Sequence, residues 1–99
     1  PPVVVRGVPR IPADAVTWNV EGALISALKP ADDGSGDVIV RIWETGGGRR
    51  IGSFDVSGTR AAVPCDALED PTGPALDRDA TGYRLVLGAF ELVTLRLSR

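Results

Sequence analysis

Short apolar runs, each closed by glycine or proline, recur along the chain and limit the fold more than any other feature. The 99 residues include 12 Gly and 8 Pro, which separate segments rich in valine, isoleucine and aromatic residues. β-Branched and aromatic side chains pack well on a pleated surface, whereas Gly and Pro suit the turns between strands. The spacing therefore predicts an all-β domain.

The sequence predicts about seven strands, at residues 16–20, 23–29, 38–44, 49–56, 61–63, 83–87 and 90–97. Tight turns should join the first strand to the second at 21–22, and the last two strands should form a hairpin. We interpret the glycines at 46–48 as another hairpin turn rather than a phosphate cradle, because the Lys-Ser/Thr of a P-loop is missing. The predicted architecture is an antiparallel β-sandwich of immunoglobulin-like type.

The strand at 38–44 gives the clearest pattern. Both of its faces are largely apolar until the strand ends, and a strand covered on both sides should lie centrally in its sheet. The two faces carry Val38, Val40, Ile42 and Glu44 on one side, and Ile39, Arg41 and Trp43 on the other. This alternation favours core packing for Trp43.

The chain divides into a connector at residues 1–15 and a C-terminal β-sandwich domain at 16–99. Four prolines mark the connector, which holds one possible edge strand at 3–5. A first residue of Pro1 rather than Met leads us to expect a segment of a longer protein. Residues 64–69 carry a signal for one helical turn, and 70–82 should form a polar loop.

Composition excludes several kinds of chemistry. Without any His, the chain cannot supply a Ser-His-Asp or Cys-His nucleophile system or a His-bearing zinc site. Cys65 is the one cysteine, so no internal disulfide is possible. A net charge of -2 and the lack of a long apolar run argue against nucleic-acid and membrane partners.

Two groups of polar and aromatic residues are candidates for a site. Lys29, Arg41 and Glu44 interrupt apolar strands near their ends, so we expect ion pairs, either within the domain or with a partner domain. Trp18, Trp43 and Tyr83 are candidates for stacking on sugar rings, as in a carbohydrate-binding module.

Several stretches resemble a known family. Residues 25–34, ISALKPADDG, and 37–44, DVIVRIWE, are similar to the "sALKpAeDG…vivRlyE" signature of the C-terminal β-sandwich domain in family 38 glycoside hydrolases, the retaining α-mannosidases. CDALE at 65–69 and AFELVTLRL at 89–97 are similar to the family's "DLLE" turn and its "pFEIkTlrL" strand. Trp43 stands where the family usually has Tyr, and Leu92 where Ile is common.

The resemblance implies a non-catalytic accessory domain of an α-mannosidase, which packs against the catalytic part and stabilises it. In that family the zinc ion, its ligands and the nucleophile lie in another domain, so we expect no cofactor here and no hydrolase activity from this chain alone. The matching positions Lys29, Arg41, Glu44 and Glu91 are pattern residues of the sandwich rather than catalytic ones.

Expected partners are the remaining domains of the parent chain, and the expected location is cytoplasmic. Two alternatives stay open. The domain could be a module that binds mannose-containing glycans through Trp18, Trp43 or Tyr83, or an independent protein-interaction domain.

Overall fold

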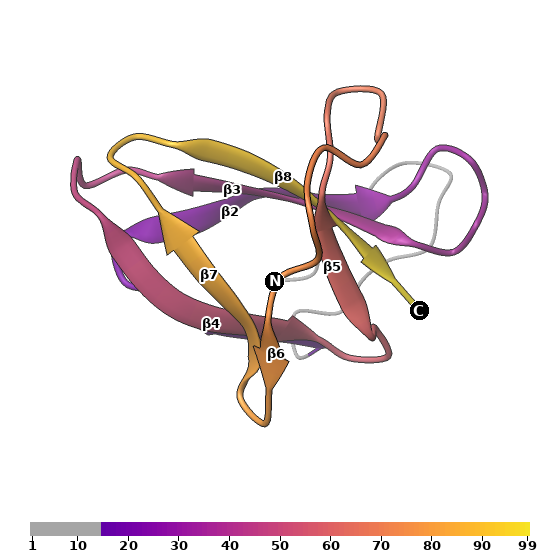
Figure 1. Ribbon diagram of the computed structural model, residues 1–99, viewed down its shortest axis with the longest axis horizontal. Helices are drawn as coiled ribbons and strands as arrows, with labels where there is room; N and C mark the ends of the chain where they lie inside the picture. The colour runs from indigo at the N-terminus through magenta and orange to yellow at the C-terminus, as the bar shows by residue number, and fades with distance from the viewer. Residues whose placement is uncertain (1–14) are drawn as a thin grey trace.

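The structure, a computed structural model, describes residues 15–99. Two antiparallel sheets form the two layers seen in Figure 1, and no α-helix occurs among the described residues. The strands are β1 (Val16–Asn19), β2 (Ala23–Pro30), β3 (Val38–Glu44), β4 (Arg50–Val56), β5 (Ala61–Pro64), β6 (Arg78–Asp79), β7 (Gly82–Leu87) and β8 (Leu92–Ser98). The all-β sandwich predicted from the sequence is confirmed.

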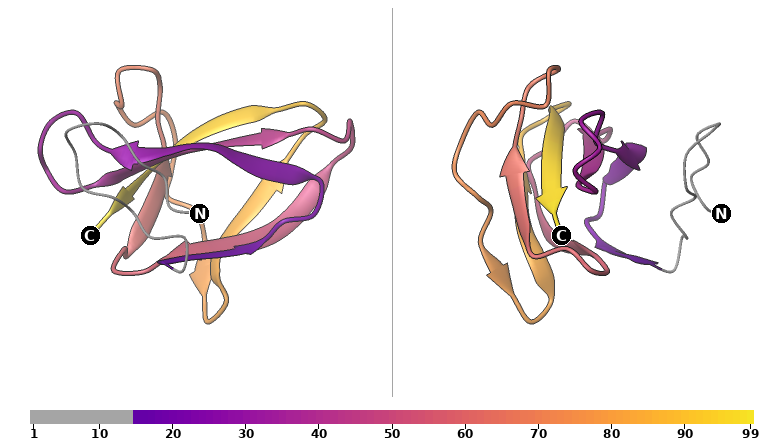
Figure 2. Two further views of the ribbon diagram at one scale, coloured as in Figure 1. Left: turned by 180° about the vertical axis from the view of Figure 1, so that it is seen from behind. Right: turned by 90° about the vertical axis from the view of Figure 1, so that its right-hand side faces the viewer.

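Each layer is a four-stranded sheet. One has the strand order β1-β4-β7-β6 and the other β2-β3-β8-β5, and two further views in Figure 2 show the layers packed face to face. β3 lies between β2 and β8, as its two apolar faces predicted. The predicted connector and its edge strand at 3–5 lie outside the described residues, apart from Ala15.

The core fills the space between the sheets. Alternate residues of each strand point inward, so β3 contributes Val40 and Ile42 and β7 contributes Leu85 and Leu87, all of them buried. At one side of this core three aromatic rings pack together: Trp18 lies 5.9 Å from Phe54, and Phe54 lies 5.4 Å from Tyr83, measured between ring centroids. Tilted arrangements at these distances are favourable for aromatic pairs.

The predicted tight turn at 21–22 is present, but the hairpins predicted at 46–48 and between the last two strands are wrong, because these connections cross between the sheets. β3 and β4 belong to different sheets, as do β7 and β8, and β1 and β2. Each of these strands directs apolar side chains into the core between the sheets. When consecutive strands lie in opposite sheets, their apolar side chains face each other across the core. In a hairpin the two strands lie side by side in one sheet, and their apolar side chains point the same way. The connections that do form hairpins are β2–β3 and β6–β7.

Two local predictions also fail. Residues 64–69 form no helical turn: Pro64 ends β5, Cys65 bridges to Pro71, and the Asp66 carboxylate accepts hydrogen bonds from the backbone of Leu68 and Asp70. Such local side-chain bonds compete with helix formation. The polar loop at 70–82 contains the short strand β6, which the sequence pattern missed.

Candidate functional site

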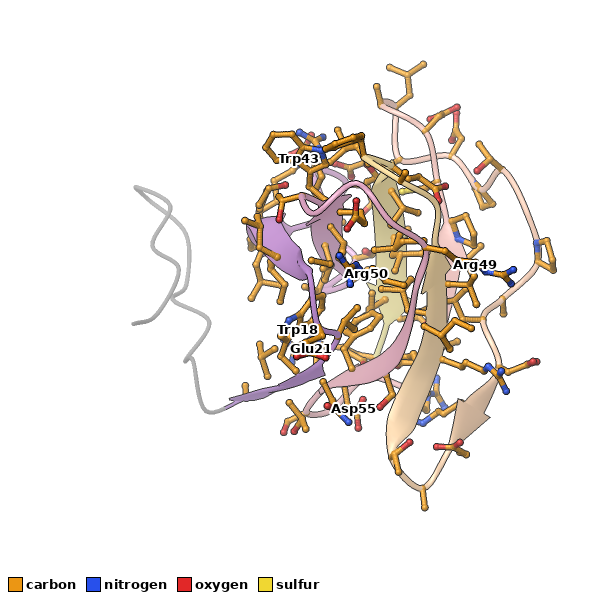
Figure 3. The ribbon with its side chains drawn as sticks, turned by 90° about the vertical axis from the view of Figure 1, so that its left-hand side faces the viewer. Trp18, Glu21, Trp43, Arg49, Arg50 and Asp55 are labelled. Atoms are coloured by element: carbon orange, nitrogen blue, oxygen red, sulfur yellow. The ribbon has the colours of Figure 1, made fainter. Side chains whose placement is uncertain are left out.

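Three crossings between the sheets meet at one end of the sandwich. They are the β1–β2, β3–β4 and β7–β8 connections, at residues 20–22, 45–49 and 88–91, which we call the turn end. Figure 3 looks onto this end. Because a crossing has no hairpin ladder, its backbone N–H groups need other acceptors.

Glu44, at the end of β3, supplies those acceptors. Its Oε1 accepts from the backbone N–H groups of Gly47 at 2.7 Å and Phe90 at 2.9 Å. Its Oε2 accepts from the N–H of Gly46 and from Nε of Arg50, both at 2.9 Å. The side chain is fully buried, and these bonds, that of Phe90 foremost, lower the pKa of Glu44 to about 2. The carboxylate therefore joins two crossings and carries no free lone pair for chemistry.

Arg50 joins the third crossing to the same carboxylate. Its guanidinium lies against Gly22, where a Cβ atom would overlap the Arg50 side chain and where φ is 78°. Figure 3 shows Arg50 lying between the two sheets while Arg49 points away. The Thr45 N–H also donates to the Gly22 carbonyl at 3.0 Å. Glu44 and Arg50 thus hold all three turns together.

Lys29 lies toward the opposite end of the sandwich and is paired within the domain. Its Nζ contacts Glu69 at 2.8 Å and Asp32 at 3.1 Å, and the hydrogen bond to Glu69 is the main reason that the pKa of Lys29 is raised. The other Glu69 oxygen accepts from the Asp32 N–H at 3.0 Å. Lys29 and Glu69 therefore fasten the 64–72 loop to the loop after β2.

Arg96 of β8 is a structural residue that the sequence analysis missed. Its guanidinium contacts Asp33 at 2.6 Å and Asp37 at 2.8 Å, and it lowers the pKa of Asp33. The signal was present, since the loop at 31–37 holds three aspartates and needs a cation beside it. Pairing fixes this loop over the outer face of the β2-β3-β8-β5 sheet, where Ala31, Ile39 and Cys65 form a small buried cluster.

The other half of that outer face is open. Leu24, Trp43 and Leu92 are cross-strand neighbours on β2, β3 and β8, and we call them the Trp43 row. Their side chains are 43%, 45% and 56% exposed. The prediction that Trp43 packs in the core is wrong, because the face opposite Ile42 turns outward at this end and none of the loops within residues 15–99 covers it. Figure 3 shows Trp43 on the outside.

Arg41 lies beside this row. It neighbours Ala27 on β2 and Thr94 on β8, is half-buried, and forms no ion pair with any of residues 15–99. Glu91, the other candidate, is exposed at the turn end, and its Oε1 accepts from the Gly88 N–H at 2.7 Å.

The three candidate sugar-stacking residues do not share a face. Tyr83 is fully buried, with its hydroxyl 2.7 Å from Thr59 Oγ1, and Trp18 packs on the core ring of Phe54. Trp43 alone is exposed, on the outside of the other sheet. The fold therefore provides no aligned platform of these aromatic side chains.

The described residues contain no cluster of three or more His, Cys, Asp or Glu side chains arranged to hold a metal ion. A shallow acidic groove of about 430 Å³ lies beside the 64–72 loop, but Arg96 and Lys29 already pair its carboxylates at Asp33 and Glu69. No helix among residues 15–99 has the length and apolar character that crossing a membrane demands.

These features define a small antiparallel β-sandwich whose charged side chains fasten its own loops and whose outer face keeps an exposed apolar row. The sequence model described as "Glycosyl hydrolases family 38 C-terminal beta sandwich domain" matches residues 22–95. The chain belongs to this family. No curated protein matches it.

Proposed function

We propose that this domain is a non-catalytic accessory part of a retaining α-mannosidase, where it packs against the catalytic part of the enzyme and stabilises it. The observation that carries the proposal is the Trp43 row, an apolar strip left open on a face that is otherwise covered. Contiguous exposed apolar patches mark surfaces that bind other proteins, and such surfaces are enriched in aromatic residues and arginine.

The polar residues support a structural role. Glu44 is saturated with hydrogen bonds from turn backbone and from Arg50. Lys29 and Arg96 are held by carboxylates of the loops that they fasten. A general acid or base needs a carboxyl group that can exchange a proton with substrate, which Glu44 in this setting cannot do. In this proposal any catalytic zinc is held by another domain.

Deletion tests the proposal directly. Removing residues 16–99 from the mannosidase polypeptide that contains them should lower its thermal stability and its soluble yield, while the domain expressed alone should hydrolyse no mannoside. An enzyme that folds, melts and turns over normally without residues 16–99 would overturn the proposal.

Sugar binding is a second candidate, which the exposure of Trp43 favours. A pyranose ring stacked on the indole should change its emission. The chain has two tryptophans, so a Trp18→Phe variant isolates the signal of Trp43. Titration of that variant with manno-oligosaccharides should leave the emission unchanged at millimolar ligand if the role is purely accessory. A saturable change in emission, together with binding heat in calorimetry that Trp43→Ala abolishes, would establish the sugar-binding role instead.

A further inference from the structure

The outer face of the β2-β3-β8-β5 sheet is half covered by the chain itself, and the boundary is sharp. Along β3, Ile39 is buried beneath Ala31 and Cys65, Arg41 is half-buried, and Trp43 is exposed. The loops that provide the cover are fixed by ion pairs rather than left loose, through Lys29 with Glu69 and Arg96 with two aspartates. Half of this face is therefore covered by loops of the chain itself, and the half at Trp43 is exposed.

The uncovered half has the composition of an interface centre. The Trp43 row spans three neighbouring strands, so its side chains form one continuous strip. Aromatic residues and arginine are enriched at the centres of protein interfaces, and here Arg41 stands in the next register position beside the strip.

Arg41 indicates the charge of the partner. Other cations on the same face, Lys29 and Arg96, have carboxylate partners within the domain. Arg41 is half-buried in the middle of a central strand, and no carboxylate among residues 15–99 pairs with it. A guanidinium that is partly removed from water on a protein surface is best satisfied by a planar acceptor such as a carboxylate.

The opposite outer face is the natural comparison. Ile51 and Val86 are cross-strand neighbours there and are about as exposed as the residues of the Trp43 row. That pair has no aromatic residue and spans two strands rather than three. Arg84, the next outward residue along β7, forms no ion pair with any of residues 15–99, but it is exposed, so water solvates its guanidinium. Among the described residues, this face therefore carries no half-buried cation that lacks a carboxylate partner.

We infer that the Trp43 row together with Arg41 is the surface through which this domain docks onto another domain of its own hydrolase polypeptide, and that the facing surface is apolar with one carboxylate opposite Arg41. The inference rests on the proposed function and adds to it the face and the chemistry of the contact. Interfaces between domains of one chain bury roughly 600–1,500 Å², so the row and its surroundings form the centre rather than the whole.

Hydroxyl-radical footprinting of the intact hydrolase and of the 99-residue chain tests the face without any mutation. Oxidation of Trp43 and Leu92 should fall several-fold in the intact enzyme relative to the 99-residue chain, while oxidation of Ile51 should stay equal in the two. Protection of Ile51 without protection of Trp43 would place the interface on the other sheet and overturn the inference, although the accessory role would survive.

Matched substitutions test the chemistry. Leu92→Lys and Arg41→Glu should each lower the melting temperature of the intact hydrolase, whereas Ile51→Lys and Arg49→Glu, at exposed positions away from the row, should not. In the 99-residue chain all four variants should melt close to the parent. Equal losses from Leu92→Lys and Ile51→Lys, or a dimer of the 99-residue chain that Leu92→Lys dissociates, would overturn the inference. Deletion of residues 16–99 without effect would instead refute the proposed function itself.

Discussion

A buried pair of hydroxyl groups gives the sharpest test of the packing between the sheets. Thr59 Oγ1 lies 2.7 Å from the Val56 carbonyl oxygen and 2.7 Å from the Tyr83 hydroxyl. A carbonyl can only accept, so the single hydroxyl proton of Thr59 goes to Val56, and Tyr83 must donate to Thr59. Tyr83 is fully buried and Thr59 nearly so. The direction of this bond makes the two partners unequal.

Removing the donor hydroxyl of Tyr83 should lower the free energy of unfolding less than removing the acceptor hydroxyl of Thr59. Tyr83→Phe deletes one hydrogen bond and leaves Thr59 still bonded to Val56, which costs about 0.5–1.5 kcal/mol. Thr59→Val leaves the phenolic hydroxyl buried without an acceptor, which costs about 1–3 kcal/mol, while the Val56 carbonyl keeps its bond from the Thr59 backbone N–H. The double variant buries no unpaired hydroxyl, so it should be more stable than Thr59→Val alone.

Urea unfolding of the 99-residue chain, followed by tryptophan fluorescence, measures these differences at constant m-value. The coupling energy of the double-mutant cycle should be about 1–3 kcal/mol, and each 1 kcal/mol should shift the melting temperature by about 4–8 °C. Thr59→Ser keeps the hydroxyl and serves as the control, in which Tyr83→Phe should cost as much as in the parent. The assigned direction of the bond would be refuted if the losses of the two single variants summed to the loss of the double variant. It would also be refuted if Thr59→Val were more stable than Tyr83→Phe.

Three further outcomes follow from the described contacts. Gly34→Ala should lower the free energy of unfolding by about 1–2 kcal/mol, because the backbone of Gly34 is left-handed. Gly82→Ala should lower it more, because a Cβ at Gly82 would also overlap the backbone of β4. Equal unfolding midpoints for the two variants would contradict this. The pKa of Glu44 is lowered from 4.5 to about 2, so its stabilisation is complete above pH 4.5 and is lost as the pH falls toward 2. Melting curves between pH 2 and 7 should show that loss, and Glu44→Gln should reduce both the stability at pH 7 and the acid dependence. Burial raises the pKa of the Cys65 thiol, so a thiol reagent at pH 8 should react slowly with the folded chain and rapidly in urea; comparable rates would show that the thiol is accessible.

Local sequence patterns were sufficient to predict every strand of residues 15–99 except β6, and the two faces that β3 presents. Alternation along 38–44 separates Val40 and Ile42, which are buried in the core, from the outward positions, because side chains of a strand alternate between faces whatever its partners are. The family signature was recognised in the same residues, and the match to residues 22–95 confirms it.

The partners of each strand and of each charge were decided by the tertiary structure. A tight turn does not reveal whether the next strand lies beside its predecessor or opposite it, so the crossings at 45–49 and 88–91 were predicted to be hairpins. Glu44 is bonded to the backbone of Phe90, which lies 46 residues away, and no local pattern encodes that distance. The exposure of Trp43 also depends on residues that are distant in the sequence. Alternation along the strand assigns Trp43 to one face of the sheet, but the tertiary structure decides whether a loop covers that face.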